Sequence, residues 1–125
     1  MFLVDTNIFL EVILSQDKKE DCKNFLNKNI GKINITDFSL HSICIILLRY
    51  GKEDIFQKFI KDVLPNVKIL SLPLELYSEI VSIKRRLNLD FDDIYQYSVA
   101  KFYKLKLVTM DRDFKKVKDI EIIFI

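Results

Sequence analysis

Short apolar runs alternate along this chain with longer segments in which apolar residues recur every three or four positions. The short runs predict five strands, at residues 2–5, 32–36, 67–70, 106–109 and 121–124. Most of these runs are apolar almost without interruption, which is typical of strands buried on both faces of a parallel sheet. Because helical segments separate the strands, the pattern predicts an α/β fold with a central, mostly parallel five-stranded sheet.

The segments between the strands carry helical spacing. Apolar stripes predict helices within residues 55–64, 76–87 and 92–104, and residues 38–48 are apolar on almost every side, which predicts a central helix. Gly31 fits a helix stop, Pro65 is expected to end one helix and Pro73 to open the next. No repeat or linker interrupts the pattern, so residues 1–125 are predicted to form a single domain.

Aspartates stand at the ends of these elements in three places. Asp5 ends the first predicted strand and Asp111 follows the fourth, while Asp93 lies at the start of the helix that leads into the fourth strand. That helix spans roughly 20 Å and the strand roughly 15 Å, so antiparallel packing brings Asp93 close to Asp111. Parallel α/β sheets form their sites at this edge. Such a cluster of acids requires a cation or raised pKa values.

Each acidic motif also has a purely structural explanation. Asp5 or Thr6 fits a helix N-cap, Asp92 fits another, and Asp93 would then interact with the helix dipole. Residues 109–114 fit a simple turn. The recurrence of acids at three places that the fold brings together favours a functional cluster over three unrelated caps and turns.

Composition narrows the functional classes. The chain is half hydrophobic and 30% charged, and its net charge of +2 is too small to indicate nucleic-acid binding by itself. The longest apolar run, residues 43–48, is far shorter than the roughly 18 residues of a membrane helix. The buried-strand pattern begins at Met1, which argues against a signal peptide. Cys22 and Cys44 have no metal-binding partners in the sequence and are expected to be reduced thiols of a cytoplasmic protein.

The ordered set of motifs resembles the PIN-domain nucleases, in particular the short prokaryotic VapC-type toxins. The resemblance rests on Asp5-Thr6-Asn7 after the first strand, on the helix that carries Asp93 and Ala100, and on residues 107–114, Leu-Val-Thr-Met-Asp-Arg-Asp-Phe. It spans essentially the whole chain. It implies a three-layer α/β/α sandwich and metal-dependent RNA cleavage, with Asp5, Asp93 and Asp111 in the places of the family's first, third and fourth acids.

One acid of the family pattern is absent. The family usually has a Glu one turn into the helix after the second strand, and Ser42 aligns with that position. Asp37 and Asp92 lie near the same edge and are candidate substitutes. His41 is a candidate contact for a phosphate or a water, or a hydrogen-bonded structural residue.

Carboxylates suit Mg²⁺ or Mn²⁺, which lowers the pKa of a bound water and neutralises charge that develops on a phosphate. We expect Asp5 and Asp93 to be the main ligands, and Asp111 to bind the ion or orient its waters. The residues expected to fix carboxylate geometry are Thr6, Asn7, Thr109 and Asp113. The basic run Lys84, Arg85 and Arg86 is either a solvated face or a phosphate contact.

Two functional hypotheses follow. The first is a metal-dependent endoribonuclease that cleaves RNA phosphodiester bonds, as the toxin of a type II toxin–antitoxin pair. The alternative is a catalytically weak PIN-fold module that binds RNA or a protein partner, and the missing Glu favours it. The three retained acids favour the nuclease. The candidate partners are an RNA substrate, a cognate antitoxin and a second copy of the chain, with no role for a membrane.

Overall fold

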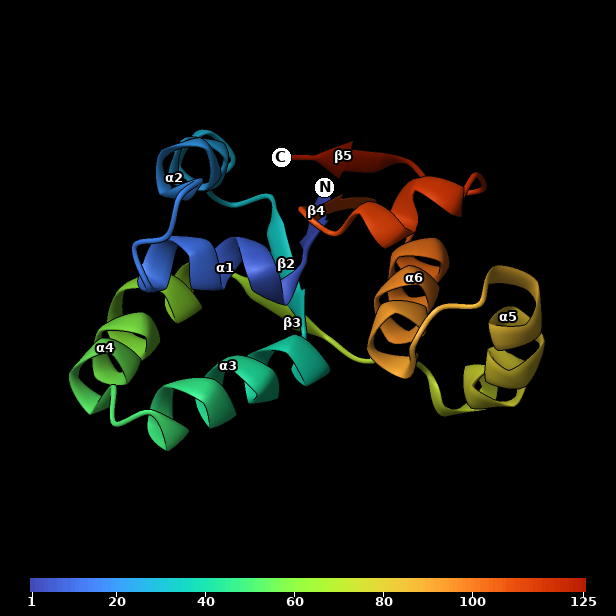
Figure 1. Ribbon diagram of the computed structural model, residues 1–125, viewed down its shortest axis with the longest axis horizontal. Helices are drawn as coiled ribbons and strands as arrows, with labels where there is room; N and C mark the ends of the chain where they lie inside the picture. Colours follow the sequence, from blue (N-terminus) through green and yellow to red (C-terminus); the bar gives the residue numbers. More distant parts are fainter.

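The computed structural model describes residues 1–125 and shows a five-stranded sheet between two layers of helices (Figure 1). The strand order is β3-β2-β1-β4-β5, and all four neighbouring pairs are parallel. The predicted three-layer α/β/α fold is confirmed, and the sheet is wholly rather than mostly parallel. The strands are β1 (Phe2–Val4), β2 (Ile33–Thr36), β3 (Lys68–Leu70), β4 (Lys106–Thr109) and β5 (Ile122–Phe124).

Six α-helices cover the two faces of the sheet. One layer contains α1 (Thr6–Ile13), α2 (Lys19–Lys28), α3 (Asp37–Arg49) and α4 (Glu53–Lys58), and the other contains α5 (Ile80–Leu87) and α6 (Phe91–Tyr103). Figure 1 shows α1 to α4 on the left and α5 and α6 on the right. None of the helices has the length and apolar character needed to cross a membrane.

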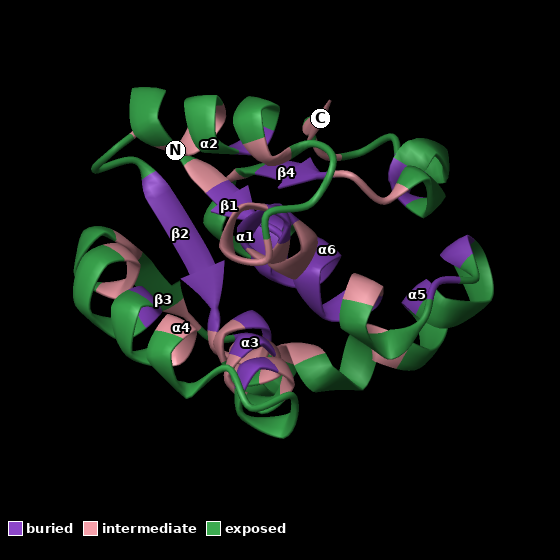
Figure 2. Cartoon of the chain, turned by 60° about the vertical axis from the view of Figure 1, so that its left-hand side comes forward, coloured by how far each residue is buried: buried purple, intermediate pink, exposed green.

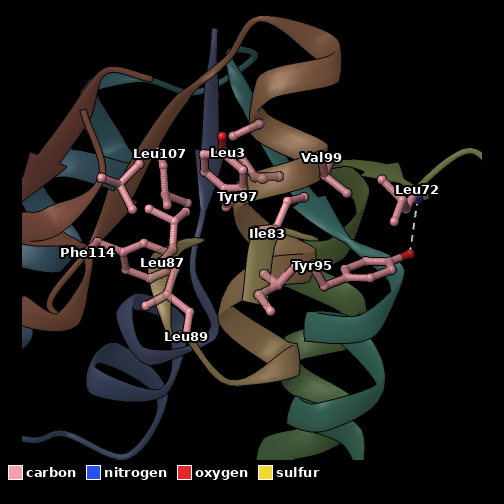
Figure 3. Packing of buried hydrophobic residues seen from close by; sticks show 13 residues of the cluster. Leu3, Leu72, Ile83, Leu87, Leu89, Tyr95, Tyr97, Val99, Leu107 and Phe114 are labelled. Carbon is pink, nitrogen blue, oxygen red and sulfur yellow. Dashed lines mark hydrogen bonds between the residues drawn. The ribbon is translucent and has the colours of Figure 1, made fainter. Parts of the chain in front are cut away.

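Alternating side chains of the two central strands divide the core into two clusters. Leu3 and Leu107 point to the α5 and α6 side, whereas Val4 and Val108 point to the side of α1 to α4. Figure 2 shows these strands buried beneath the exposed outer faces of the helices, and Figure 3 shows Leu3 and Leu107 among the side chains of the first cluster. Full burial of each such side chain contributes about 1.5–3 kcal/mol, so a register slip of one residue would be costly.

The stripe at residues 55–64 forms a partly buried face, with Phe59 buried and Ile60 exposed, and its assignment to one α-helix is wrong. α4 ends at Lys58 and continues as a π-helical turn, Phe59–Val63, in which the backbone N–H of Leu64 bonds to the carbonyl of Phe59. A 3₁₀ turn, Leu64–Asn66, follows. Pro65 cannot donate a backbone hydrogen bond, which helps to end the helix here.

The stripe at residues 76–87 also contains two kinds of helix. A 3₁₀ helix, Leu74–Glu79, follows Pro73 and leads directly into α5. Gly31 lies in the turn after α2 with φ of 87°, a left-handed conformation that favours glycine. Both cysteines are free thiols, with Cys22 buried and Cys44 half-buried, as expected.

The helix at residues 38–48 is not central, which corrects the prediction. α3 buries Ile43 and Leu47, but Ile45 and Leu48 remain 52% and 49% exposed. It packs mainly on β2, α1 and α4 and contacts α6 at its first turn, while these exposed residues lie on its outer side. Apolar residues on all sides of a helix therefore do not imply burial on all sides, because position in the layer decides which face is covered.

The two central strands lie side by side although roughly a hundred residues separate them. From β1 the chain moves outward to β2 and β3, and then returns to the other side of β1 to form β4 and β5. The backbone N–H of Asp5 donates to the carbonyl of Val108 at 2.9 Å, so the exits of β1 and β4 are joined. In open α/β sheets this reversal of strand order is where ligand sites form.

Candidate metal centre

Asp5 is held rigidly at the exit of β1. Its Oδ1 accepts a hydrogen bond from the backbone N–H of Thr6 at 2.7 Å, so Asp5 caps α1 as its structural explanation predicts. Its Oδ2 accepts from the hydroxyl of Thr109 at 2.8 Å and from the Asn7 amide at 3.3 Å. The carboxylate is 8% exposed. Capping and membership of the acidic site are therefore compatible at this residue.

Asn7 ties the start of α1 to the end of β4. Its amide nitrogen also lies 3.4 Å from the hydroxyl oxygen of Thr109, and its Oδ1 accepts from the backbone N–H of Met110 at 3.3 Å. The hydroxyl oxygen of Thr109 in turn accepts from the backbone N–H of Asp111 at 2.9 Å. These bonds fix Asp5 and Asp111 relative to each other, which agrees with the predicted orienting roles of Asn7 and Thr109.

Three further carboxylates meet beside Asp5. One oxygen each from Asp93, Asp111 and Asp113 can be chosen so that all three lie within 4.8 Å of one another. Asp93 comes from the first turn of α6, whereas Asp111 opens a short 3₁₀ helix, Arg112–Lys116, and accepts from the backbone N–H of Asp113 at 2.9 Å. The predicted convergence of Asp93 and Asp111 is present in the structure, and Asp113 joins them directly.

The start of α6 differs from the capping explanation of this motif. Asp90, not Asp92, occupies the N-cap position, and its side chain makes no capping hydrogen bond. Asp92 and Asp93 both lie in the first helical turn and both line the acidic pocket. Because Asp92 is inside the helix, its carboxylate is free to face the site.

The acids surround an open pocket of about 320 Å³ between α1, α3 and α6. Asp5, Asp92, Asp93 and Asp111 line it, and Asp113 lies at its edge as part of the carboxylate group described above. The remaining lining residues are Thr6, Asn7, Leu10, Phe38, Ser42, Ile46 and Gln96. The pocket therefore has an acidic wall from α6 and the strand ends, and an uncharged wall of polar and apolar residues from α1 and α3.

Burial and mutual repulsion raise the pKa of two of these carboxyls. Burial, with a smaller contribution from the charges of Asp111 and Asp92, raises the pKa of Asp5 to about 6, against the lowering effect of the hydrogen bonds from Thr109 and Thr6. Burial also raises the pKa of Asp93 to about 7, and the nearby charges of Asp92, Asp111, Asp5 and Asp113 add to the shift. Without a cation, the folded protein therefore favours the protonated, uncharged form of both groups.

No basic side chain neutralises the cluster. The two ion pairs of the structure, Lys101 with Asp119 and Lys106 with Glu121, lie elsewhere. Arg112 stands between Asp111 and Asp113 in the sequence, but its guanidinium lies over the ring of Phe124, 5.0 Å from the ring centre. Uncompensated carboxylates that converge on one pocket are the arrangement expected of a site that binds a cation.

Sequence comparison identifies the family. The model of the PIN domain matches residues 2–120. The chain belongs to the PIN-domain family. A comparison with curated proteins found no match.

Solved PIN structures share the fold of this chain at low sequence identity. A structure titled as a toxin–antitoxin complex from Klebsiella pneumoniae contains a chain 18% identical, with a TM-score of 0.77 over 96% of this chain and 95% of that one. VapBC2 from Rickettsia felis, bound to a DNA fragment from its promoter, gives 21% identity, a TM-score of 0.75 and coverage of 98% and 97%. VapC20 from Mycobacterium tuberculosis is titled as a sarcin–ricin loop cleaving toxin. It is 14% identical to this chain, with a TM-score of 0.77 over 97% of this chain and 99% of that one.

Among the candidate substitutes for the missing Glu of this PIN domain, only Asp92 lines the pocket. The Oδ1 atom of Asp37 accepts from the Tyr95 hydroxyl at 2.7 Å and from the backbone N–H of Phe38 at 2.8 Å, which holds this carboxylate outside the lining. His41 is exposed and also outside the lining. The structure therefore does not bring Asp37 or His41 to the site.

Ser42 does reach the pocket, on the wall that α3 contributes. Its hydroxyl donates to the carbonyl of Phe38 on its own helix at 3.0 Å. None of the α3 residues in the lining is acidic, so this wall carries no carboxylate. The position aligned with the family's Glu thus faces the site, and a hydroxyl stands there in place of a charge.

The basic run lies on α5, apart from the acidic pocket. Lys84, Arg85 and Arg86 are exposed. Arg86 donates to the hydroxyl of Tyr97 at 3.1 Å and lines a different pocket, between α5 and α6. The aromatic residues Tyr95 and Tyr97 are buried in the core.

Sequence reasoning missed Gln96. It follows Asp93 by three positions on α6, it is 3% exposed, and it lines the acidic pocket. The i, i+3 spacing from Asp93 places it on the same helical face and was the available signal. Gln96 lies in a helix whose neighbouring residues mostly belong to the core, so its sequence context does not mark it as a site residue.

The donor set of the pocket fits a hard divalent cation. All the converging ligand atoms are oxygens, and Mg²⁺ and Mn²⁺ prefer oxygen ligands. At a metal–oxygen distance of about 2.1 Å, two ligands of one ion lie up to about 4.2 Å apart, close to the 4.8 Å that encloses the oxygens of Asp93, Asp111 and Asp113. With Asp5 beside them, these are the residues that would hold such an ion.

Proposed function

We propose that this PIN domain is a Mg²⁺- or Mn²⁺-dependent endoribonuclease, and that it acts as the toxin of a type II toxin–antitoxin pair. The observation that carries the proposal is the convergence of Asp5, Asp92, Asp93, Asp111 and Asp113 on one pocket edge without a basic partner. A purely structural role does not account for this arrangement, because it raises the pKa values of Asp5 and Asp93 and thus disfavours the folded state at neutral pH.

The comparisons support the proposal at the level of family. The PIN-domain model matches nearly the whole chain. The solved structures with the same fold include two toxin–antitoxin assemblies and one toxin described as cleaving the sarcin–ricin loop. On this basis we propose RNA as the substrate and an antitoxin as a partner. A second copy of the chain as a further partner, and the cytoplasm as the place of action, stay predictions from the sequence.

The residues of the pocket have separate tasks in this proposal. Asp5, Asp93 and Asp111 hold the ion, with Asp113 as an additional ligand or an anchor for its waters. The bound ion supplies charge neutralisation at the scissile phosphate and lowers the pKa of a water. Thr109 and Asn7 keep the Asp5 carboxylate in place, and Thr6 fixes its second oxygen through the backbone. The exposed Lys84, Arg85 and Arg86 are candidate contacts for the RNA backbone away from the pocket.

Cleavage of RNA by the purified protein tests the proposal. We expect single-stranded or structured RNA to be cut in the presence of Mg²⁺ or Mn²⁺, and EDTA to stop the reaction. Restoring Mn²⁺ after EDTA treatment should restore cleavage. RNA that stays intact under all of these conditions, with a folded protein that binds Mn²⁺, would overturn the nuclease assignment.

One observation favours a second function. The α3 wall carries Ser42 and no carboxylate, so the site lacks the charged ligand that the family pattern has on this helix. A PIN domain with a weakened metal site would act as a module that binds RNA or a protein partner. RNA binding with cleavage no faster than that of Asp93→Asn would support this alternative. A reading frame for a small DNA-binding antitoxin beside this gene would favour the toxin.

A further inference from the structure

The side chain of Gln96 is buried in the wall of the acidic pocket with only one of its two polar ends in use. One end of its amide bonds to the hydroxyl of Ser39 on α3. The other end, Oε1, has no hydrogen-bond partner in the protein. A carboxamide can bind the Ser39 hydroxyl with either end, and in both orientations its second end is left without a partner.

A buried polar atom without a partner costs about 1–3 kcal/mol. Native proteins offset this cost with an ordered water or an ion. The pocket beside Gln96, at about 320 Å³, has room for several waters of roughly 30 Å³ each, and its carboxylates provide further partners for them. The pocket that Gln96 lines therefore offers the space and the further polar groups that a bound water requires.

Gln96 is also the one polar side chain on this part of the wall whose hydrogen-bonding capacity points to a ligand. Ser42, the other polar residue there, donates its hydrogen to the Phe38 carbonyl, and the nearby Phe38 and Ile46 are apolar. Gln96 stands one helical turn after Asp93, so the two side chains lie on the same face of α6. Gln96 thus lines the same pocket as the carboxylates, which receives no acid from α3.

We propose that Gln96 is a positioning residue of the divalent-cation site and holds the ion through one ordered water. This inference rests on the proposed function, because it requires the acidic pocket to bind the ion. The carboxylates supply the charge, and the amide of Gln96 supplies a neutral hydrogen bond that keeps the water, and through it the ion, on the α3 side of the pocket.

Calorimetric titration of Mn²⁺ into the metal-free protein and its variants tests the proposal. We expect Gln96→Leu, which keeps the volume and removes the amide, to weaken Mn²⁺ binding roughly 10-fold, the lower end of the effect of losing an outer hydrogen-bond partner of a metal site. Ser98→Ala is the matched control. Ser98 lies on the same helix and also has a buried hydroxyl without a partner, but it lines the pocket between α5 and α6. Its variant should bind Mn²⁺ as the parent does.

A second variant keeps the test decisive if Gln96→Leu does not fold. Gln96→Glu retains an acceptor for Ser39 and adds a charge at the free end, so it should bind Mn²⁺ as tightly as the parent or more tightly. Parent-like affinity in Gln96→Leu, weaker affinity in Gln96→Glu, or an equal loss in Ser98→Ala would overturn the role of Gln96 and leave the nuclease proposal intact. A parent protein that binds no Mn²⁺ would overturn both.

Discussion

The hydroxyl of Thr109 donates to Oδ2 of Asp5 at 2.8 Å, although the two residues stand 104 positions apart. The same hydroxyl oxygen accepts from the backbone N–H of Asp111 at 2.9 Å. Thr109 is completely buried at the end of β4. One side chain therefore links the first acid of the site to the last strand-end acid, and it does so at the point where the order of the strands reverses.

Replacing Thr109 by Val should loosen this link. The variant keeps the shape but leaves Asp111 N–H without its partner and Asp5 without a hydrogen bond that lowers its pKa. We expect the free energy of unfolding to fall by about 1–3 kcal/mol and Mn²⁺ affinity to fall roughly 10-fold. Urea unfolding and calorimetry measure these changes. Thr6→Val is the control, because Thr6 bonds to Asp5 through its backbone N–H alone; an equal loss there would contradict the prediction.

Replacing Asp93 by Asn should abolish RNA cleavage and leave the fold unchanged, because it removes a charge at nearly constant volume. Asp90→Asn is the matched control, since Asp90 lies at the same helix end but outside the pocket lining. Cleavage assays at saturating Mn²⁺, with circular dichroism to verify folding, separate the two residues. An active Asp93→Asn variant would exclude the role assigned to Asp93.

The metal-free protein should become less stable as the pH rises from about 5 to 8. The pKa values of Asp5 and Asp93 are raised from 3.8 to about 6 and about 7, so the folded state binds protons more tightly than the unfolded state. Stability is therefore greatest where both carboxyls are protonated and is lost as the pH passes through the folded-state values. Melting curves in EDTA at several pH values test this, and a melting temperature that rises across the same range would contradict it.

Mn²⁺ should reverse that trend. An ion binds the ionised carboxylates, so its stabilising effect is expected to be larger at pH 8 than at pH 5.5.

Asp93→Asn should stabilise the metal-free form at pH 8 by about 1 kcal/mol, after a discount for solvent screening of a half-exposed group. It should also lose most of the Mn²⁺-induced rise in melting temperature. Equal Mn²⁺ shifts in the parent and the variant would show that Asp93 is not part of a metal site.

Placing a carboxylate on the α3 wall should strengthen the site. Ser42 lines the pocket on the wall that α3 contributes, and Ser42→Glu adds a charged ligand there. We expect tighter Mn²⁺ binding by calorimetry and faster cleavage. Affinity equal to or below that of the parent would mean that Asp92 or Gln96 already serves this wall, or that Ser42 is not the position of the family's Glu.

Much of the fold is already determined by the order of residue types along the chain. Runs such as residues 2–4 are apolar, short and followed at once by an acid, so they predict both a buried parallel strand and its functional end. Asp5, Asp93 and Asp111 could be assigned to one edge because the lengths of α6 and β4 leave little freedom in where their ends meet. These inferences succeed because they depend on neighbours in the sequence.

Other features depend on contacts between distant segments, and only the tertiary structure decided them. α3 is apolar all round, yet it is peripheral because no element packs on its outer face. The carboxylate of Asp37 accepts a hydrogen bond from the hydroxyl of Tyr95, 58 positions away, and does not line the site. Gln96 enters the pocket because α3 and α6 meet at Ser39. A local pattern shows which side chains are acidic or apolar, but the packing of the layers determines which partner each of them finds.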